Sequence, residues 1–442
     1  GFGAWHVILH ALPLLQEPPG HGASVPLTQV AVPVGEDTAP GLSNATASVA
    51  ASRGTAARTP IPRTPGVARG TPAAVVGLGT GSTLLVVLAC GPEHLDQLLV
   101  AINSAVVHAA DPSRLLFRVV TFTADAPTLL SKLRARLPRA TDLDTVTFDA
   151  WVPRVSLMLG GSSSSRKELF GVLNFAAFYV HELFPRAQRA LYIDTDVVVQ
   201  GDLASALSSR DLEGQPVAAA RDCSQRLGKY VDLDRLKRKN VHAELPLELK
   251  ARKDACVTNR GVVLIDIARW AAANMTGTIE ALVHFHLSKK GPLWKSGVSQ
   301  PPFLLAIAGR YYDLGAEFNV RGLGRGDIAP DEVAHYRKHG LWSKYFDGFM
   351  RKCEFNCCPG CKGYALTPYL SPNAHLAKVL HFNGRLKPQA RTRRGLEPVL
   401  PPKSGLSKDE RAKREQIPLC SCGKDCLQEC AGLWWKYLPP PS

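Results

Sequence analysis

The stretch Arg189-Ala-Leu-Tyr-Ile-Asp-Thr-Asp-Val-Val-Val-Gln-Gly-Asp202 decides the fold, because an apolar run is interrupted by two carboxylates and then resumes. Such a segment predicts a buried strand of a parallel sheet, and open α/β folds bind ligands at the carboxyl ends of these strands. Asp194 and Asp196 stand at that end, and side chains two residues apart in an extended segment share one face. Because paired anions repel each other and resist desolvation, we predict a divalent metal site here.

The same Asp-x-Asp spacing occurs at two other places, so the spacing alone is a weak signal. Asp142-Leu-Asp144 precedes an apolar stretch instead of ending one, and Asp232-Leu-Asp234 runs into basic residues. We expect both pairs to be solvated charges in a loop or at a helix end.

The composition allows a large folded domain with appendages. The chain has 442 residues, 45% of them hydrophobic, and its net charge of +15 favours an acidic partner without choosing among nucleic acid, an anionic membrane, a nucleotide and an acidic polysaccharide. Residues 1–16 are either the remnant of a signal anchor or a disordered terminus. Residues 17–81, rich in Pro, Gly, Ala and Thr, predict a flexible stem. A folded domain over 82–390 and a basic, cysteine-rich tail over 391–442 follow.

Predicted strands and helices alternate after the stem, which favours a mostly parallel sheet covered on both faces. The predicted strands are 83–89, 115–121, 145–148, 189–199, 216–220 and 261–265. The predicted helices are 93–108, 127–137 and 166–183, the last leading into the central strand.

Several motifs in a fixed order carry a family resemblance that runs from about residue 83 to 388. They are Val172-Leu-Asn-Phe-Ala, Leu191-Tyr-Ile-Asp-Thr-Asp-Val-Val-Val, Ala219-Ala-Arg-Asp-Cys, Ala255-Cys-Val-Thr-Asn-Arg-Gly-Val-Val-Leu-Ile-Asp-Ile-Ala-Arg-Trp270, Gln300-Pro-Pro-Phe-Leu-Leu, Arg321-Gly-Leu-Gly and His381-Phe-Asn-Gly-Arg-Leu-Lys-Pro388. Together they resemble glycosyltransferase family 8, and within it the plant galacturonosyltransferase-like branch. The resemblance implies a Rossmann-like GT-A fold, a nucleotide-sugar donor, Mn²⁺ and transfer with retention of anomeric configuration.

The resemblance also implies a metal and diphosphate site. Asp194 and Asp196 match the metal-binding pair, and His381 matches the histidine that completes it. Gly384 and Lys387 match the His-x-x-Gly-x-x-Lys signature that holds the donor diphosphate. Without Gly384 and Lys387 at their spacing, His381 is better explained as a packed or surface histidine, and the alternative for Lys387 is a solvated charge in a basic stretch.

Three further positions match residues that contact the donor sugar, namely Asp222, Asn259 and Gln300. Gln300 also matches a position near the face from which the acceptor attacks. Alternative structural roles stay open for all three: a loop aspartate, a turn or cap residue, and a polar residue before two prolines.

The chemistry accounts for these residue types. Carboxylates, one imidazole and phosphate oxygens suit a hard ion such as Mn²⁺, which neutralises the departing diphosphate. Lys387 adds positive charge where the leaving group becomes more anionic, so it acts chiefly in the transition state. Because no well-placed carboxylate nucleophile stands out, we expect front-face substitution, with Gln300 orienting groups or stabilising charge.

The chain departs from the family pattern where the base and the sugar are expected to bind. Gly91 and His94 replace an aspartate and an aromatic residue, Ala177 replaces an arginine, and Ser299 replaces an aspartate. Gln389 replaces a tryptophan, and Arg166 is a candidate to compensate for the arginine missing at position 177. These departures concern base and sugar selectivity, and they leave a catalytically poor homologue as an alternative.

Cysteines gather near the end of the chain, where Cys353-x3-Cys-Cys-x2-Cys361 and Cys420-x-Cys-x3-Cys-x3-Cys430 hold eight of the eleven. In an oxidising lumen they predict disulfides, with zinc as the competing interpretation. Cys90, Cys223 and Cys256 are expected to be buried thiols. The segment 433–437 is expected to pack on the domain, and the basic tail is either a solvated loop or a docking site for an acidic acceptor.

The resemblance implies a Golgi-lumen enzyme, anchored at its N-terminus, that transfers a sugar from a UDP-sugar to a cell-wall or surface polysaccharide, with UDP-galacturonate as the candidate donor. The sequons at Asn44 and Asn274 fit a secretory lumen. The alternative is a non-catalytic homologue that acts as a scaffold in a glycosyltransferase complex. A nucleic-acid-binding role is disfavoured, because the basic residues lack interleaved aromatic residues.

Overall fold

A computed structural model describes most of the chain from residue 83 onward. The described residues are 83–160, 171–208, 211–238, 252–288, 292–294, 297–324, 334, 338, 377–384, 387–389 and 430–441. The predicted anchor, the stem, Arg166 and the two cysteine clusters lie outside these residues, apart from the backbone of Cys430.

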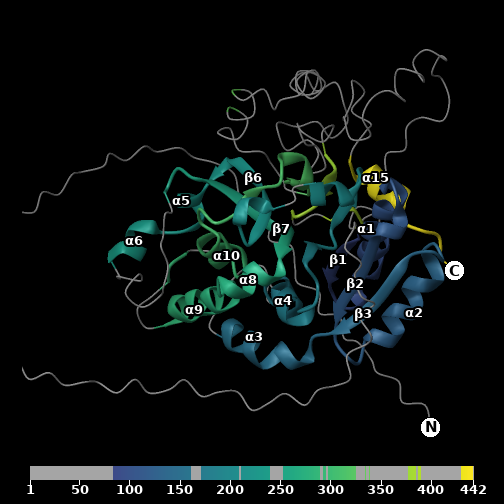
Figure 1. Ribbon diagram of the computed structural model, residues 1–442, viewed down its shortest axis with the longest axis horizontal. Coiled ribbons are helices and arrows are strands. Elements are labelled where there is room, and N and C mark those ends of the chain that lie inside the picture. Colours follow the sequence, from purple (N-terminus) through teal and green to yellow (C-terminus); the bar gives the residue numbers. More distant parts are fainter. Residues whose placement is uncertain are drawn as a thin grey trace, which may run out of the picture. The chain divides into compact units, whose positions relative to one another are not determined.

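A seven-stranded sheet forms the centre of the described structure (Figure 1). Its strands, in sheet order, are β3 (Asp142–Thr147), β2 (Leu115–Thr121), β1 (Leu84–Ala89), β4 (Arg189–Ile193), β7 (Cys256–Asp266), β6 (Val217–Arg226) and β8 (Tyr312–Asp313). The strands β3, β2, β1 and β4 are parallel, β7 runs antiparallel to both of its neighbours, and β8 runs parallel to β6. The predicted mostly parallel sheet is confirmed.

Helices cover both faces of this sheet. The α-helices are α1 (Leu95–His108), α2 (Ala126–Arg136), α3 (Val152–Leu159), α4 (Val180–Leu183), α5 (Leu227–Tyr230), α6 (Leu233–Arg238), α8 (Ile267–Ala272), α9 (Met275–Leu287), α10 (Gln300–Ala306) and α15 (Cys430–Tyr437). Alternate residues of β1 enter two different cores: Val86 packs with α1 and α2, and Val87 packs with α3, α8, α9 and α10. Both faces of β1 are thus buried, which explains why its sequence is a continuous apolar run.

A smaller three-stranded sheet joins distant parts of the chain. It consists of β5 (Val197–Val199), β10 (Val379–His381) and β9 (Val320–Arg321), with β10 in the middle. The strand β10 pairs antiparallel with β5 and places His381 opposite Val197. Because β5 directly follows the Asp-x-Asp segment, this register brings His381 to the two aspartates.

The structure corrects two predictions about local structure. Asp142 and Asp144 lie on the edge strand β3 and not in a loop or at a helix end. They remain at least partly solvated, and Asp142 pairs with Arg118 at 2.8 Å. In place of one helix over 166–183, the described part contains a 3₁₀ helix, η5 (Val172–Tyr179), followed by the short α4.

The prediction that Cys223 and Cys256 are thiols was wrong, because they form a disulfide that joins β6 to β7. The register between the two strands shifts just beside this bridge, between Asp222 and Arg226, so ladder pairing alone does not hold the ends together. Cys90 is a buried free thiol as predicted, and burial raises its pKa.

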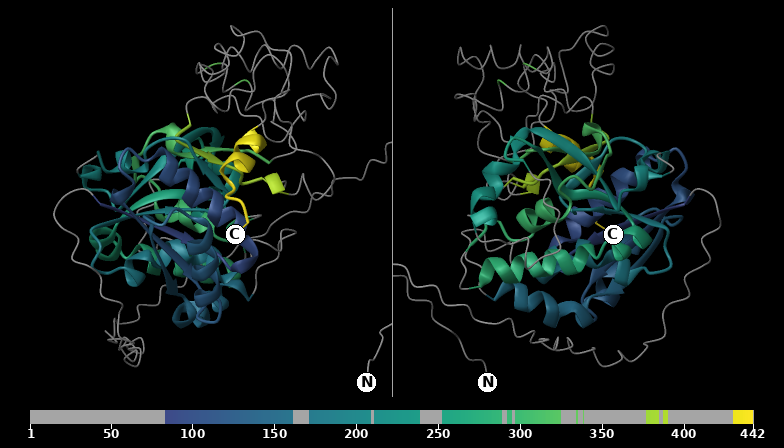
Figure 2. Two further views of the ribbon diagram at one scale, coloured as in Figure 1. Left: turned by 90° about the vertical axis from the view of Figure 1, so that its right-hand side faces the viewer. Right: turned by 60° about the vertical axis from the view of Figure 1, so that its left-hand side comes forward.

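The C-terminal helix α15 packs against α1, as expected for the segment 433–437 (Figure 2). The Asn103 side chain donates to the backbone carbonyl of Tyr437 at 2.9 Å, and the His108 and Tyr437 rings meet edge to face. Trp434 is fully buried. The end of the chain therefore belongs to the folded body.

We predict that the Cys223–Cys256 bridge stabilises the fold. It closes a sequence separation of 33 residues, for which the chain-entropy model gives about 3–4 kcal/mol. The double variant Cys223→Ser/Cys256→Ser should lose roughly this much unfolding free energy in urea titrations. An oxidised wild type no more stable than the double variant would contradict the assignment.

Candidate active site

The Asp-x-Asp segment sits where the chain leaves the large sheet and enters the small one. The backbone N–H of Asp194 donates to the Gly261 carbonyl of β7 at 2.7 Å, and the Asp196 carbonyl accepts from the Phe382 N–H at 2.8 Å. Each aspartate is thus tied through its backbone to a different sheet. Thr195 between them donates its hydroxyl to Gln97 of α1 at 3.1 Å.

The side chains of Asp194, Asp196 and His381 converge on one point. The Nε2 atom of His381 lies 3.1 Å from Asp196 Oδ1 and 3.6 Å from Asp194 Oδ2. One ligand atom from each of the three residues lies within 4.8 Å of the others. The sequence prediction that these three side chains meet is therefore consistent with the geometry.

Asn319, at the end of η8 (Ala316–Asn319), orients the imidazole. Its Oδ1 atom lies 2.9 Å from His381 Nδ1, while its amide nitrogen donates to the Asn259 carbonyl at 3.2 Å. The amide orientation that satisfies both contacts makes Nδ1–H the donor to Asn319. The Nε2 atom of a neutral ring then directs its lone pair at the two carboxylates, as in metal sites with a hydrogen-bonded second shell.

The three residues fit a divalent cation. Asp196 Oδ1 and His381 Nε2 are both buried and have no hydrogen-bond partner, although they face each other. A neutral imidazole lone pair beside two carboxylates is electrostatically unfavourable unless a cation or proton lies between them. Two carboxylates and one imidazole form a donor set that suits Mn²⁺.

Lys387 lies next to this group. Its ammonium donates to Asp196 Oδ2 at 2.5 Å and to the Phe382 carbonyl at 2.7 Å. Burial by itself raises the pKa of Asp196, but the charge of Lys387 and the contact with His381 outweigh it, and the pKa lies well below its ordinary value. Asp196 is therefore ionised, as a metal ligand must be.

Gly261 leaves the space that the metal group needs. A Cβ atom at this position would lie 2.2 Å from His381 Cε1 and 2.6 Å from Asp194 Oδ2. No larger residue fits without moving one of these side chains.

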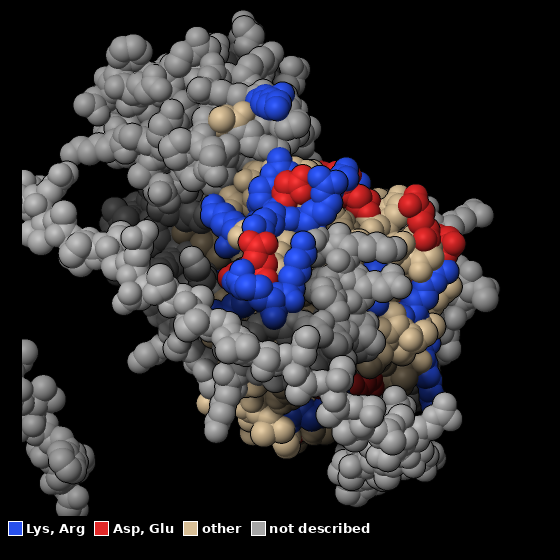
Figure 3. All heavy atoms as spheres, turned by 90° about the vertical axis from the view of Figure 1, so that its left-hand side faces the viewer, with Lys and Arg blue, Asp and Glu red and all other residues tan. Residues whose placement is uncertain are grey.

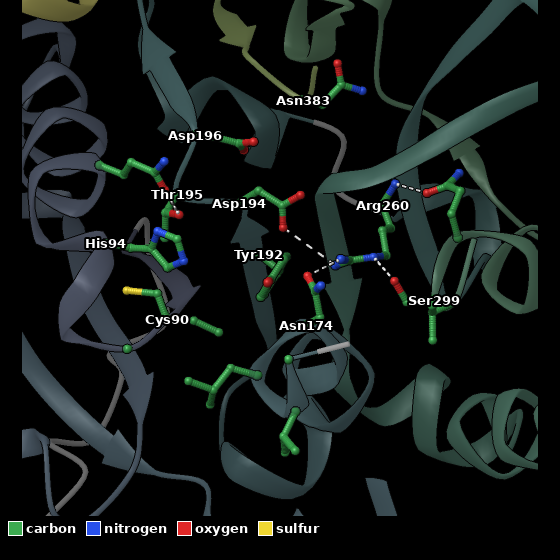
Figure 4. Close-up of a pocket in the computed structure, with 18 of the residues that line it drawn as sticks. Cys90, His94, Asn174, Tyr192, Asp194, Thr195, Asp196, Arg260, Ser299 and Asn383 are labelled. Carbon is green, nitrogen blue, oxygen red and sulfur yellow. Dashed lines mark hydrogen bonds and ion pairs between the residues drawn. The ribbon is translucent and has the colours of Figure 1, made fainter. Parts of the chain in front are cut away.

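Arg260, the neighbouring residue on β7, is a buried cation at the site. Its Nε donates to Ser299 Oγ and its Nη2 to Asn174 Oδ1, both at 2.8 Å, and its Nη1 lies 3.6 Å from Asp194 Oδ1 (Figure 4). Burial lowers the pKa of Arg260, yet the Asp194 carboxylate outweighs this and raises it.

These groups line a cavity of about 920 Å³. Gly91 and His94 are among the lining residues, and Asn174 and Ser299 lie beside Arg260 (Figure 4). This volume lies at the upper end of the range for small-molecule sites and is adequate for a nucleotide sugar.

Of the other four predicted site residues, the structure places two at the cavity and two outside its lining. Asn259 and Gln300 line the cavity, but Asp222 and Gly384 are not among its lining residues. The Asp222 carboxylate pairs with Arg321 and accepts from the Ser224 N–H at 2.9 Å. Its role in donor binding stays a prediction.

Backbone groups hold the side chains of Asn259 and Gln300 at the cavity wall. The Asn259 Oδ1 accepts from the Gly261 N–H at 2.9 Å, which is the turn-like bonding that its alternative interpretation predicts. Gln300 Oε1 accepts from the Arg260 N–H at 3.1 Å, and its Nε2 donates to the Thr258 carbonyl. These bonds fix the side chains while leaving them at the cavity wall.

Sequence reasoning missed Arg260, Asn174 and Asn319 as site residues. Arg260 and Asn174 stand inside motifs that carry the family resemblance, but no role was assigned to them. A charged residue within the apolar strand β7 was the signal for Arg260, because such a residue is rarely buried without a partner. Nothing in the local sequence marks Asn319 as the partner of His381.

Comparison with known families identifies the class. The family model described as glycosyl transferase family 8 matches residues 85–392. A relative from Arabidopsis thaliana, "Probable galacturonosyltransferase 6", is 29% identical over 54% of this chain and 41% of its own length. "Glycosyltransferase 8 domain-containing protein 1" from Mus musculus is 24% identical over 70% of this chain and 73% of its own length. The chain thus spans about two fifths of the plant relative.

Solved structures also resemble the chain, though too weakly to support an argument on their own. The galactosyltransferase LgtC in complex with donor and acceptor sugar analogs is 17% identical with a TM-score of 0.45, covering 75% of this chain and all of LgtC. Mouse xyloside xylosyltransferase 1 is 15% identical with a TM-score of 0.40, covering 69% of this chain and 98% of that protein.

The structure is thus that of an α/β protein with a candidate metal site in a cavity. The chain belongs to glycosyl transferase family 8, because the family model covers more than half of its residues. The predicted resemblance to the galacturonosyltransferase-like branch is confirmed by the plant relatives.

We predict that Gly261→Ala weakens Mn²⁺ binding at least about tenfold, because the added methyl group displaces His381 or Asp194. Electron paramagnetic resonance of free Mn²⁺, titrated in the presence of UDP, measures this. Gly160→Ala is the matched control, since its Cβ would lie no closer than 3.6 Å to another atom. Equal Mn²⁺ affinity in the Gly261→Ala variant would contradict the proposed ligand group.

Proposed function

We propose that this protein is a retaining, Mn²⁺-dependent hexosyltransferase that transfers a sugar from a UDP-sugar, with UDP-galacturonate as the candidate donor, to an acidic polysaccharide. The observation that carries the proposal is the convergence of Asp194, Asp196 and His381 beside Lys387 in a cavity large enough for a nucleotide sugar. UDP-galacturonate is proposed as the donor because of the names of the plant relatives.

We assign metal binding and stabilisation of the leaving group to different residues. Asp194, Asp196 and His381 would hold the metal, which supplies Lewis-acid neutralisation of the diphosphate as the glycosidic bond breaks. Lys387, at 2.5 Å from Asp196, stands beside that position and adds a charge that interacts most strongly with the more anionic leaving group.

Front-face substitution is the proposed route to retention. The described residues that line the cavity include four carboxylates, of which Asp194 and Asp196 are the proposed metal ligands. The other two, Glu93 and Asp125, lie in the 3₁₀ helix after β1 and directly before α2, respectively. Gln300, fixed by the backbone of β7, orients the reacting groups. Detection of a sugar covalently attached to the protein during turnover would overturn this route.

A basic face supports an acidic acceptor. Lysines and arginines gather around a few carboxylates on the face to which α5 and α6 belong (Figure 3). The exposed cations of these elements and the adjacent strand ends are Arg226, Lys229, Lys237, Arg238, Arg252 and Lys253. Tyr230, the last residue of α5, lines the cavity, so the face adjoins the site where an acceptor hydroxyl must enter.

A Golgi lumen is the proposed compartment. The disulfide between Cys223 and Cys256 and the exposed sequon residue Asn274 suit an oxidising secretory environment. None of the helices within the described ranges is both long and apolar enough to cross a bilayer. We also propose an N-terminal membrane anchor and association with a partner glycosyltransferase.

Release of UDP from a panel of UDP-sugars, with and without Mn²⁺, tests the function. We expect Mn²⁺-dependent hydrolysis by the wild type and a loss of at least about a hundredfold in Asp196→Asn, because the variant loses a charged metal ligand. Asp234→Asn is the matched control and should retain activity. Asp234 belongs to another Asp-x-Asp pair, and its side chain is half exposed.

Two outcomes would contradict the proposal. Hydrolysis that persists in Asp196→Asn would place the chemistry elsewhere. Binding of UDP and Mn²⁺ by the wild type without turnover of any donor, together with stable association with a partner enzyme, would establish the scaffold alternative.

A further inference from the structure

Arg260 is a charged side chain held rigidly inside the cavity wall. It is 7% exposed, and its Nε and Nη2 atoms donate to Ser299 and Asn174. These two contacts come from different segments, one preceding α10 and one within η5, and together they fix the plane of the guanidinium. A buried arginine with a fixed plane can select a ligand by geometry as well as by charge.

The third nitrogen of this guanidinium has no hydrogen bond of good geometry, although the Tyr192 hydroxyl interacts with the guanidinium. Arg260 Nη1 is buried and unsatisfied, and its nearest carboxylate oxygen, Asp194 Oδ1, is 3.6 Å away. Arg260 lines the cavity beside Tyr192 and Asn174 (Figure 4). An unsatisfied N–H of a buried cation is costly, so its presence at a ligand cavity indicates that a ligand atom completes it.

Arg260 and the other cation of the cavity differ in the charge of their hydrogen-bond partners. Among the described lining residues, the lysine and arginine side chains are Lys387 and Arg260. Lys387 donates a hydrogen bond to the carboxylate of Asp196, whereas the hydrogen bonds of Arg260 go to a neutral hydroxyl and a neutral amide. Arg260 is therefore the lining cation that lacks a hydrogen-bonded carboxylate.

We propose that Arg260 is a specificity-determining residue that binds the donor sugar and favours a sugar that carries a carboxylate. The inference rests on the proposed function and deepens it, because it assigns the choice of a uronic acid over a neutral hexose to one side chain. An anionic oxygen satisfies a desolvated guanidinium better than a hydroxyl does, since charge-assisted hydrogen bonds are about twice as strong.

The proximity of Asp194 does not cancel this preference. Asp194 shares its charge with the metal site that it forms with Asp196 and His381, so less of its negative field reaches the sugar. The Arg260–Asp194 contact at 3.6 Å is an ion pair without a hydrogen bond, so it does not satisfy the Nη1 protons.

Calorimetric titration with UDP-galacturonate, UDP-galactose and UDP in the presence of Mn²⁺ tests the proposal. We expect the wild type to bind the uronate at least about tenfold more tightly than the hexose, which is the difference between a charged and a neutral hydrogen bond. Arg260→Gln should reduce the ratio of the two affinities to about one.

Two further variants keep the test decisive. Arg118→Gln, which breaks an exposed ion pair on β2, should preserve the wild-type ratio. Arg260→Lys retains the charge but not the planar fork, so its ratio should fall several-fold and stay above one. Thermal unfolding of each variant shows whether it folds. If Arg260→Gln does not fold, the affinity ratios of Arg260→Lys and of the wild type test the proposal instead.

The proposal is overturned if the wild type binds UDP-galactose as tightly as UDP-galacturonate, or if the uronate preference persists in Arg260→Gln. These results differ from a failure of the proposed function, which would appear as no binding of UDP with Mn²⁺ by the wild type. A wild type that hydrolyses neutral UDP-hexoses without preference would keep the transferase function and reject the role of Arg260.

Discussion

The antiparallel pairing of β5 with β10 is the constraint on which the site depends, because it carries His381 from the far end of the domain to the Asp-x-Asp segment. The register places His381 opposite Val197, and Phe382 N–H then bonds to the Asp196 carbonyl. The large sheet fixes the other side through the bond from Asp194 N–H to the Gly261 carbonyl. The two sheets thus meet at the candidate metal position, and neither alone could form it.

The charges at this position depend on one another. Asp196 remains ionised although it is buried, because Lys387 and His381 compensate the cost of burial. Asp194 faces Arg260 on one side and His381 on the other. Removing one partner leaves a buried charge uncompensated, which costs more than the pair contributes. The absence of a Cβ at position 261 is equally part of the arrangement, since it leaves room for His381 and Asp194 to approach closely.

Sequence patterns predicted the fold well where burial and periodicity act locally. The apolar runs of β1 and β2 were found almost to the residue, and the Asp194–Asp196 pair was found because strand spacing fixes its direction. The disulfide between Cys223 and Cys256 was missed, because the pairing of β6 with β7 is not encoded in the spacing of cysteines. The bonds from Arg260 to Asn174 and Ser299 were missed for the same reason, since they join three segments that only the folded chain brings together.

The central claim is that one divalent cation is shared by Asp194, Asp196 and His381. Anomalous diffraction at the manganese absorption edge, from crystals grown with Mn²⁺ and UDP, measures this directly. The account predicts one anomalous peak bonded to all three side chains and to the diphosphate. A peak bonded to other residues, or diphosphate bound there without any metal, would contradict it.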